Sequence, residues 1–260
     1  MAKKRIFITG ATSGLGRGAA LARAAKHHVV AAGETWPQVR GLRADAEAKH
    51  VQLEVIKLDL LDEIDIRHAA TIAAGVDVLV LNAGIQESGA LADIPIDRLR
   101  RSFDINVFGH LQLVQAVLPS MLARKRGKIV WLSSIAGLQA VPFLGAYSAT
   151  KHAIEAIAGA MSLELAPLGI KVATVTPGIY GTGFNDTGAD SMGQWRDPKT
   201  AMVPTPSLAT ALKVQSDPQE MIDAMVEIIP ASHHRYRTMR PDAMVEEAKL
   251  AQAAAWEIKI

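Results

Sequence analysis

The chain has 260 residues, of which 49% are hydrophobic, 21% charged and 5% aromatic, and its formal net charge is +2. A chain of this length and composition can bury a large core, which excludes a disordered chain, a collagen and a small disulfide-stapled scaffold. The absence of cysteine excludes thiolate nucleophiles and cysteine-built zinc sites, and the small net charge argues against nucleic acid as a main partner.

Short apolar runs alternate with helical stretches along most of the chain. The runs that predict strands are Arg5–Thr9, His28–Ala32, Val51–Leu58, Val76–Leu81, Lys128–Ser133 and Lys171–Thr176. The stretches that predict helices are Leu15–Lys26, Asp62–Ala74, Pro95–Leu122 and Ala149–Leu165. Strands separated by helices predict βαβ crossovers, and therefore an α/β fold whose parallel sheet is covered by helices on both faces.

Two later segments depart from this alternation. Gly181–Pro218 is rich in Gly, Pro, Thr, Asp and Ser, and it follows the last expected strand. Such a segment would lie over the carboxyl ends of the strands, where ligands bind in open α/β sheets. We expect a substrate lid at about residues 183–216; the alternative is a surface insertion without a role. The tail, about residues 240–260, is helical in character from Met244 and could cap the cleft or pack on a neighbouring subunit.

The basic N-terminus, Met1–Arg5, is followed by only a few apolar residues, which is too short a run for a signal peptide. No run of 18 or more apolar residues is present, so no membrane span is expected. We therefore expect a cytoplasmic protein without a membrane or nucleic-acid partner.

A glycine-rich turn, Thr9–Gly16, follows the first expected strand and opens the first expected helix. Glycine lets the backbone approach a pyrophosphate closely, and a helix N-terminus offers that anion free N–H groups and a partial positive charge. The spacing, Gly-x-x-x-Gly-x-Gly, differs from the common dinucleotide fingerprint and from the nucleoside-triphosphate loop. Taken alone, the turn is compatible with dinucleotide binding or with close packing.

Tyr147 and Lys151 are four residues apart on an expected helix, which places them on one face. A nearby ammonium favours the phenolate and lowers the pKa of a tyrosine, which could then exchange a proton with an alcohol. Ser134 follows the fifth expected strand, and its hydroxyl could bond the same substrate oxygen. The alternative for the Tyr147 and Lys151 pair is a partly exposed helix face.

The combination of motifs is more specific than any one of them. Its members are Thr9–Gly16, Asn82–Gly84, Ser134, Tyr147 with Lys151, and Pro177-Gly178. In order and spacing, from Arg5 to about Ile229, the chain resembles the classical short-chain dehydrogenase/reductase family. The resemblance implies a Rossmann-like doubly wound parallel sheet in a single domain over residues 1–260. It also implies an oxidoreductase that transfers a hydride between NAD(P) and an alcohol or carbonyl substrate.

The resemblance also implies the roles of individual residues. It assigns catalysis to Asn106, Ser134, Tyr147 and Lys151. Tyr147 would be the general acid/base, and Lys151 would lower its pKa and bond the nicotinamide ribose. Ser134 is preferred over Ser133 because it lies 13 residues before the tyrosine. Asn106 would hold a water in the proton relay; the alternative is a buried amide that bonds helix backbone.

The residues expected to contact the cofactor are Gly10, Ser13, Gly14, Leu15, Gly16, Glu34, Asp59, Leu60, Asn82, Ala83, Gly84, Tyr147, Lys151, Pro177, Gly178, Tyr180 and Thr182. Gly33 stands where NAD-preferring members often have Asp, but a carboxylate at Glu34 would repel the 2′-phosphate of NADP. Only Arg17 and Arg40 are nearby cations. NAD is therefore the favoured cofactor, with NADP as the alternative, and Glu34 could also simply face solvent.

The substrate and the assembly are less defined by the sequence. An apolar pocket could be lined by Phe143, Leu144, Ile179, Tyr180, Phe184, Met192 and Trp195, each of which could equally be core or lid packing. In this family the helices that contain Asn106–Met121 and Ala149–Leu165 form a dimer contact, so we expect a homodimer or homotetramer. The apolar residues cited for it are Leu111, Leu113, Val114, Val117, Ile154, Ile157 and Met161, which could also pack on the sheet.

Other functions were also considered. The histidine pairs His27-His28 and His233-His234 lack the spacing of a metal site, so no metal is expected. A non-catalytic NAD(P)-binding regulator would not need Ser134, Tyr147 and Lys151 together. A dehalogenase-type relative without cofactor would have lost Gly14, Gly16 and Lys151. We therefore expect a small alcohol or ketone as the partner of this chain.

Overall fold

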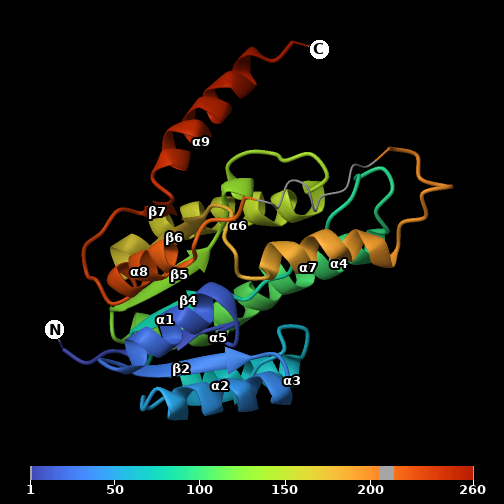
Figure 1. Cartoon of the computed structure of the whole chain (residues 1–260). Coiled ribbons are helices and arrows are strands. Elements are labelled where there is room, and N and C mark those ends of the chain that lie inside the picture. Colours follow the sequence, from blue (N-terminus) through green and yellow to red (C-terminus); the bar gives the residue numbers. More distant parts are fainter. Residues whose placement is uncertain (1, 205–213, 260) are drawn as a thin grey trace.

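A parallel sheet organises the chain in this computed structural model, which describes residues 2–204 and 214–259 (Figure 1). The strands of the described part are β1 (Arg5–Ile8), β2 (His28–Gly33), β3 (Glu54–Lys57), β4 (Val78–Leu81), β5 (Gly127–Leu132), β6 (Ile170–Pro177) and β7 (Arg237–Arg240). Their spatial order is β3-β2-β1-β4-β5-β6-β7, and every neighbouring pair is parallel. The order reverses between β1 and β4, which is the switch point where open α/β sheets bind ligands.

Helices cover both faces of this sheet. One face carries α1 (Gly14–Ala24), α2 (Trp36–Ala48) and α8 (Gln219–Ile228), and the other carries α3 (Glu63–Ala73), α5 (His110–Ala123) and α6 (Gly145–Leu165). Strand side chains alternate between the two layers. Phe7 packs in the hydrophobic cluster under α3, α5 and α6, whereas Ile6 and Ile8 pack in the cluster under α1, α2 and α8. The predicted doubly wound, Rossmann-like single domain is therefore confirmed.

Three elements were missing from the prediction. Strand β7 has arginine at both ends and Thr238 and Met239 between them, of which only Met239 is buried, so it has no apolar run. Helix α2 is mostly polar, although the capping box of Thr35 with Gln38 and the proline at its start were usable signals. Helix α8 buries Met221, Ala224, Met225 and Ile228, a helical spacing hidden behind the irregular segment before it.

Other elements differ from expectation in their bounds. Helix α6 begins at Gly145 rather than Ala149, and β3 is shorter than the expected Val51–Leu58. The predicted lid contains a helix, α7 (Phe184–Ser191), followed by a short 3₁₀ turn, Met192–Gln194; its residues 205–213 lie outside the described residues. The helical tail is α9 (Ala243–Ala254), which projects away from the rest of the molecule (Figure 1).

The expected helix Pro95–Leu122 is one continuous but irregular helix. It runs through α4 (Ile96–Phe103), a π-helical turn at Asp104–Gly109, and α5. By length and composition alone this helix could cross a membrane, but half of its most apolar window is buried within the fold, as in a core helix. The extra residue of a π turn shifts the side chains that follow it, and such turns are frequent at functional sites.

The apolar residues cited for a dimer contact have a simpler role. Leu113, Val114, Val117, Ile154 and Met161 are buried in the core cluster beneath α5 and α6, and Leu111 and Ile157 pack against it. Their pattern is therefore explained by packing on the sheet. The homodimer or homotetramer stays a prediction.

A buried polar network ties the switch point together. The Thr9 hydroxyl oxygen accepts hydrogen bonds from the N–H groups of Asn82 (2.9 Å) and Ala83 (3.0 Å). Its own proton is then available to Nε2 of His110, 3.0 Å away. This makes Nδ1 of His110 the protonated nitrogen, which donates to the carbonyl of Asn106 at 3.2 Å. The network joins the end of β1, the end of β4 and the π turn.

Gly109 closes the π turn against a neighbouring backbone. A Cβ at this position would lie 2.4 Å from the carbonyl oxygen of Leu60. We expect Gly109→Ala to lower the free energy of unfolding by about 1–3 kcal/mol, because backbone must move. The control is Gly41→Ala in α2, where a Cβ meets nothing within 4 Å. It should raise that free energy by about 0.5–1 kcal/mol. Urea unfolding measures both, and equal shifts would contradict the assignment.

His110 should make stability depend on pH. Burial lowers the pKa of His110 to about 4, so between pH 6.5 and 4 the unfolded chain binds a proton that the folded chain refuses. Stability therefore falls as the pH falls through this window, by about 3 kcal/mol in total. His110→Gln keeps a donor and an acceptor without titrating. Its unfolding free energy should fall less over the same window, and parallel curves for the two proteins would contradict this account.

Candidate active site

The glycine turn lies at the carboxyl end of β1, against the segment that follows β4. Gly10 has a φ of +59°, and a Cβ there would lie 2.6 Å from Cα of Ala83. Gly16 is equally confined, since its Cβ would lie 2.3 Å from Nδ2 of Asn82. The Asn82 amide donates to the carbonyls of Thr9 (3.0 Å) and Gly10 (2.9 Å), which fixes the shape of the turn. Side chains at these glycines would break this contact.

The N-terminus of α1 faces the same region. Ser13 is its N-cap residue and makes no side-chain capping bond in the described part of the chain. Gly14 and Leu15 open the helix, and a Cβ at Gly14 would lie 3.2 Å from Cβ of Thr182. The segment after β6 therefore reaches the glycine turn, as the prediction for Thr182 requires. Free helix N–H groups beside a close backbone suit a pyrophosphate.

The end of β2 borders the turn on its other side. The N–H of Ala11 donates to the carbonyl of Ala32 at 2.9 Å, and a Cβ at Gly33 would meet Thr12. Glu34 follows directly and is exposed. Arg17, one of the two cations near this edge, is held by Asp45 in an ion pair of 2.7 Å.

The remaining predicted cofactor residues differ in how they lie. Asp59 is half-buried, and one of its carboxylate oxygens accepts from the N–H of Leu61 (2.9 Å), while Leu60 is part of the core. Pro177 ends β6, and the N–H of Gly178 donates to Arg240. Tyr180 is 2% exposed and packs in the core cluster under α8. Its side chain therefore belongs to the core, and only its backbone could face a ligand.

Ser134, Tyr147 and Lys151 converge beside the carboxyl end of β5. All three are buried, and the Ser134 side chain hydrogen-bonds the phenol of Tyr147. The ammonium of Lys151 lies 5.5 Å from the centroid of the Tyr147 ring and donates to the carbonyl of Leu132 at 2.7 Å. Helix α6 places the tyrosine and the lysine on one face, as their spacing predicts.

Burial dominates the electrostatics of this group. It raises the pKa of Tyr147, which the hydrogen bond from Ser134 opposes, and it lowers the pKa of Lys151 to about 7. From the sequence, the pKa of Tyr147 is expected to be lowered by the nearby ammonium of Lys151. In the structure it is raised, because burial of the phenol outweighs that effect. The phenol is therefore held in its protonated form, ready to donate.

Asn106 lies in the π turn, close to this group. Its amide accepts from the N–H of Ile85 (2.8 Å) and donates to the carbonyl of Ile85 (2.8 Å) and to Thr150 (3.1 Å). A Cβ at Gly84 would lie 3.1 Å from Oδ1 of Asn106 and 3.9 Å from Nζ of Lys151. Asn106 therefore fixes the segment Asn82–Ile85 near the lysine, and it bonds loop backbone rather than the helix backbone considered in the alternative.

The predicted lid covers the tyrosine. The rings of Phe184 and Tyr147 are 5.8 Å apart between centroids, at an angle of 56°. Trp195, expected in the pocket, instead donates its indole N–H to Glu87. Sequence reasoning also missed His110 and, although it included Thr9 in the glycine turn, the contacts of the Thr9 hydroxyl. The signal for His110 was its place four residues after Asn106 on one helix.

These features together fit a dinucleotide. The glycine turn lies so close to Asn82 and Ala83 that a Cβ at Gly10 or Gly16 would clash with them, and the α1 N-terminus at this cradle suits a pyrophosphate. Lys151, which lies with Ser134 and Tyr147, is close to Gly84. Among residues 2–204 and 214–259, no three His, Asp or Glu side chains cluster as metal ligands would.

Comparison with known proteins agrees with this geometry. The sequence pattern of the family described as short chain dehydrogenase matches residues 4–192. The oxidoreductase YusZ of Bacillus subtilis is 35% identical over 192 residues, which are 72% of this chain and 69% of YusZ. Dehydrogenase/reductase SDR family member 7B of the mouse is 38% identical over 69% of this chain and 58% of its own length. The match thus spans less than two thirds of that relative.

Solved structures share the whole fold. A short-chain dehydrogenase from Streptomyces avermitilis is 28% identical, with a TM-score of 0.79 over 99% of this chain and 97% of its own. A short chain dehydrogenase/reductase from Burkholderia phymatum, solved in complex with NAD, has a TM-score of 0.82 over 98% of this chain and 95% of its own. At 22% identity this similarity shows the fold alone. The chain therefore belongs to the short-chain dehydrogenase/reductase family of oxidoreductases.

Proposed function

We propose that this protein is an NAD-dependent alcohol dehydrogenase or carbonyl reductase with Tyr147 as the general acid/base. The observation that carries the proposal is the buried contact of Ser134, Tyr147 and Lys151, one glycine away from the nucleotide cradle. Two hydroxyl groups that meet at one point can polarise one carbonyl oxygen. The printed name of a relative that is 34% identical, the 3-ketodihydrosphingosine reductase of Bacteroides thetaiotaomicron, also indicates a ketone.

The chain's own residues would handle the proton and the orientation of the substrate. When bound, the nicotinamide cofactor supplies or accepts the hydride. Ser134 and Tyr147 hold the substrate oxygen, and Tyr147 donates its proton to that oxygen during reduction. Lys151 stabilises the phenolate that remains, because its ammonium lies 5.5 Å from the ring centroid. Phe184 covers the ring and excludes water from this step.

The alternative is a regulator that binds NAD(P) on the same fold without turning over a substrate. It has no need for a serine and a lysine on either side of a buried tyrosine. Cytoplasmic localisation and a homo-oligomeric assembly stay predictions.

The first test replaces the phenol. Tyr147→Phe should lower kcat for acetophenone reduction by about 10²–10⁴-fold, because it removes the proton donor. The affinity for NADH, measured by tryptophan fluorescence, should change little. Tyr236→Phe is the matched control: this tyrosine directly precedes β7, where its carbonyl accepts from the N–H of Thr174, and loss of its hydroxyl should leave turnover unchanged. NADH binding without turnover of any alcohol or ketone in the wild type would favour the regulator.

The second test concerns the cofactor. Glu34 is exposed next to the glycine turn and Arg17 is held by Asp45, which supports NAD over NADP. We expect NADH to bind about tenfold or more tightly than NADPH, since like charges repel. Glu34→Gln should reduce that ratio, whereas Glu47→Gln at the far end of α2 should not. Titration of each cofactor measures the ratio, and equal affinities in the wild type would contradict the preference.

A further inference from the structure

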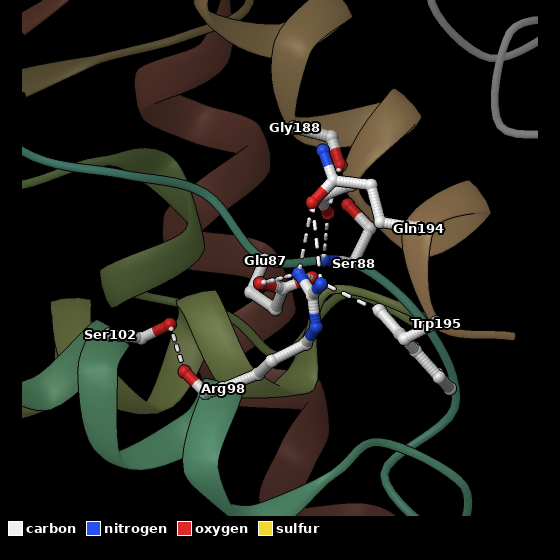
Figure 2. A network of polar contacts seen from close by, with 8 residues as sticks. Glu87, Ser88, Arg98, Ser102, Gly188, Gln194 and Trp195 are labelled. Carbon is white, nitrogen blue, oxygen red and sulfur yellow. Dashed lines mark hydrogen bonds and ion pairs between the residues drawn. The ribbon is translucent and has the colours of Figure 1, made fainter.

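Glu87 is a buried carboxylate that lies just after the Asn82–Gly84 motif and is 6% exposed. Its Oε2 pairs with Nη1 of Arg98 in α4 at 3.2 Å, and its Oε1 accepts from the indole N–H of Trp195 at 3.2 Å (Figure 2). Arg98 also donates to the side-chain oxygen of Gln194 at 3.3 Å. A buried carboxylate must be paired, so this one draws three separate segments together.

Backbone contacts reinforce the same junction. The N–H of Ser88 donates to the hydroxyl of Ser191 at 3.1 Å, and that hydroxyl donates to the carbonyl of Gly188 at 2.7 Å. Gly89 has a φ of +131°, and a Cβ there would lie 2.4 Å from the ring of Trp195. The indole therefore lies directly on this glycine. One end of the segment Phe184–Trp195 is docked on Glu87–Gly89.

The other end of the same segment covers the catalytic tyrosine. Helix α7 has eight residues, so its two ends are about 12 Å apart. Phe184 begins the helix over the Tyr147 ring, and Ser191 ends it at the docked junction. A shift at the docked end is carried along about two turns of helix to the phenyl ring.

We propose that Glu87, Arg98 and Trp195 form a latch that positions Phe184 over Tyr147 and thereby sets the size of ketone or alcohol that reaches the phenol. The specificity half of this proposal rests on the function proposed above. The three residues are positioning residues: they contact the lid and its support, not the reacting atoms. Trp195 lies outside the hydrophobic clusters of the described residues, so its contacts serve this junction rather than the core.

Hydrogen exchange tests the latch without using activity. Arg98→Met removes the charge partner of Glu87, and peptides from residues 184–195 should then exchange about tenfold faster or more, with those from β1 and β4 unchanged. Trp195→Phe keeps the ring on Gly89 but removes the N–H, so its effect should be smaller. The matched control is Arg100→Met, because Arg100 is exposed on the same helix and its ion pair with Asp97, at 3.3 Å, is exposed as well. Unchanged exchange in Arg98→Met, or an equal rise across the sheet, would overturn the latch.

Substrate size tests the specificity half. In Arg98→Met and Trp195→Phe the ratio of kcat/KM for benzophenone to that for acetophenone should rise about tenfold, with NADH affinity retained. An unchanged ratio alongside faster lid exchange would overturn this half and leave a purely mechanical latch. If the wild type reduces neither ketone, the proposed function fails for these probes, whereas the exchange experiment still decides the latch.

Discussion

One hydroxyl oxygen, that of Thr9, determines how the two halves of the sheet meet. It accepts hydrogen bonds from the backbone N–H groups of Asn82 and Ala83, and the same hydroxyl donates a hydrogen bond to Nε2 of His110. The bond to His110 is buried and the other two are partly buried, so leaving any of these groups without a partner would be costly. The glycine turn and the segment after β4 are thereby fixed relative to each other at the switch point. The cofactor cradle is consequently as rigid as the sheet.

The same network reaches the catalytic group through the π turn. His110 donates to the carbonyl of Asn106, and the Asn106 side chain pairs with both backbone polar groups of Ile85. The cradle, the Asn82–Ile85 segment and the neighbourhood of Lys151 thus form one connected body. Within the proposed function this rigidity has a chemical purpose, because hydride transfer tolerates little error in the distance between cofactor and substrate.

Burial determines the protonation of Tyr147 and Lys151 in this group. The neutral phenol of Tyr147 and a lysine with a pKa of about 7 are both consequences of removing charge from water. A protonated phenol can donate at once to a developing alkoxide, whereas alcohol oxidation must first move that proton elsewhere. Within the proposed function, the protonated phenol is the state that serves carbonyl reduction.

The sequence predicts what depends on spacing and misses what depends on contact. The four-residue separation of Tyr147 and Lys151 and the turn from Thr9 to Gly16 are local patterns, so the fold and the catalytic group were predictable. The raised pKa of Tyr147 depends on burial among segments far apart in the chain, and strand β7 is held by its neighbour β6 rather than by its own apolar residues. The bond from Trp195 to Glu87 was not predictable, because a tryptophan in an irregular segment offers no sign of a carboxylate far away in the sequence.

The loop after β4 connects the glycine turn with the predicted lid. Its first residues, Asn82–Ile85, are fixed by Thr9 and Asn106, and its next residues, Glu87–Gly89, carry the end of the predicted lid. Only a few residues separate the two sets of contacts. A lid held at Glu87 is therefore attached to the same short loop as the nucleotide cradle. The Phe184 ring, 5.8 Å from the ring of Tyr147, is then connected to Thr9 through a series of contacts. Within the proposed function, the placement of the substrate and of the cofactor would follow from this single loop, which explains how a surface segment can be aligned with a buried phenol.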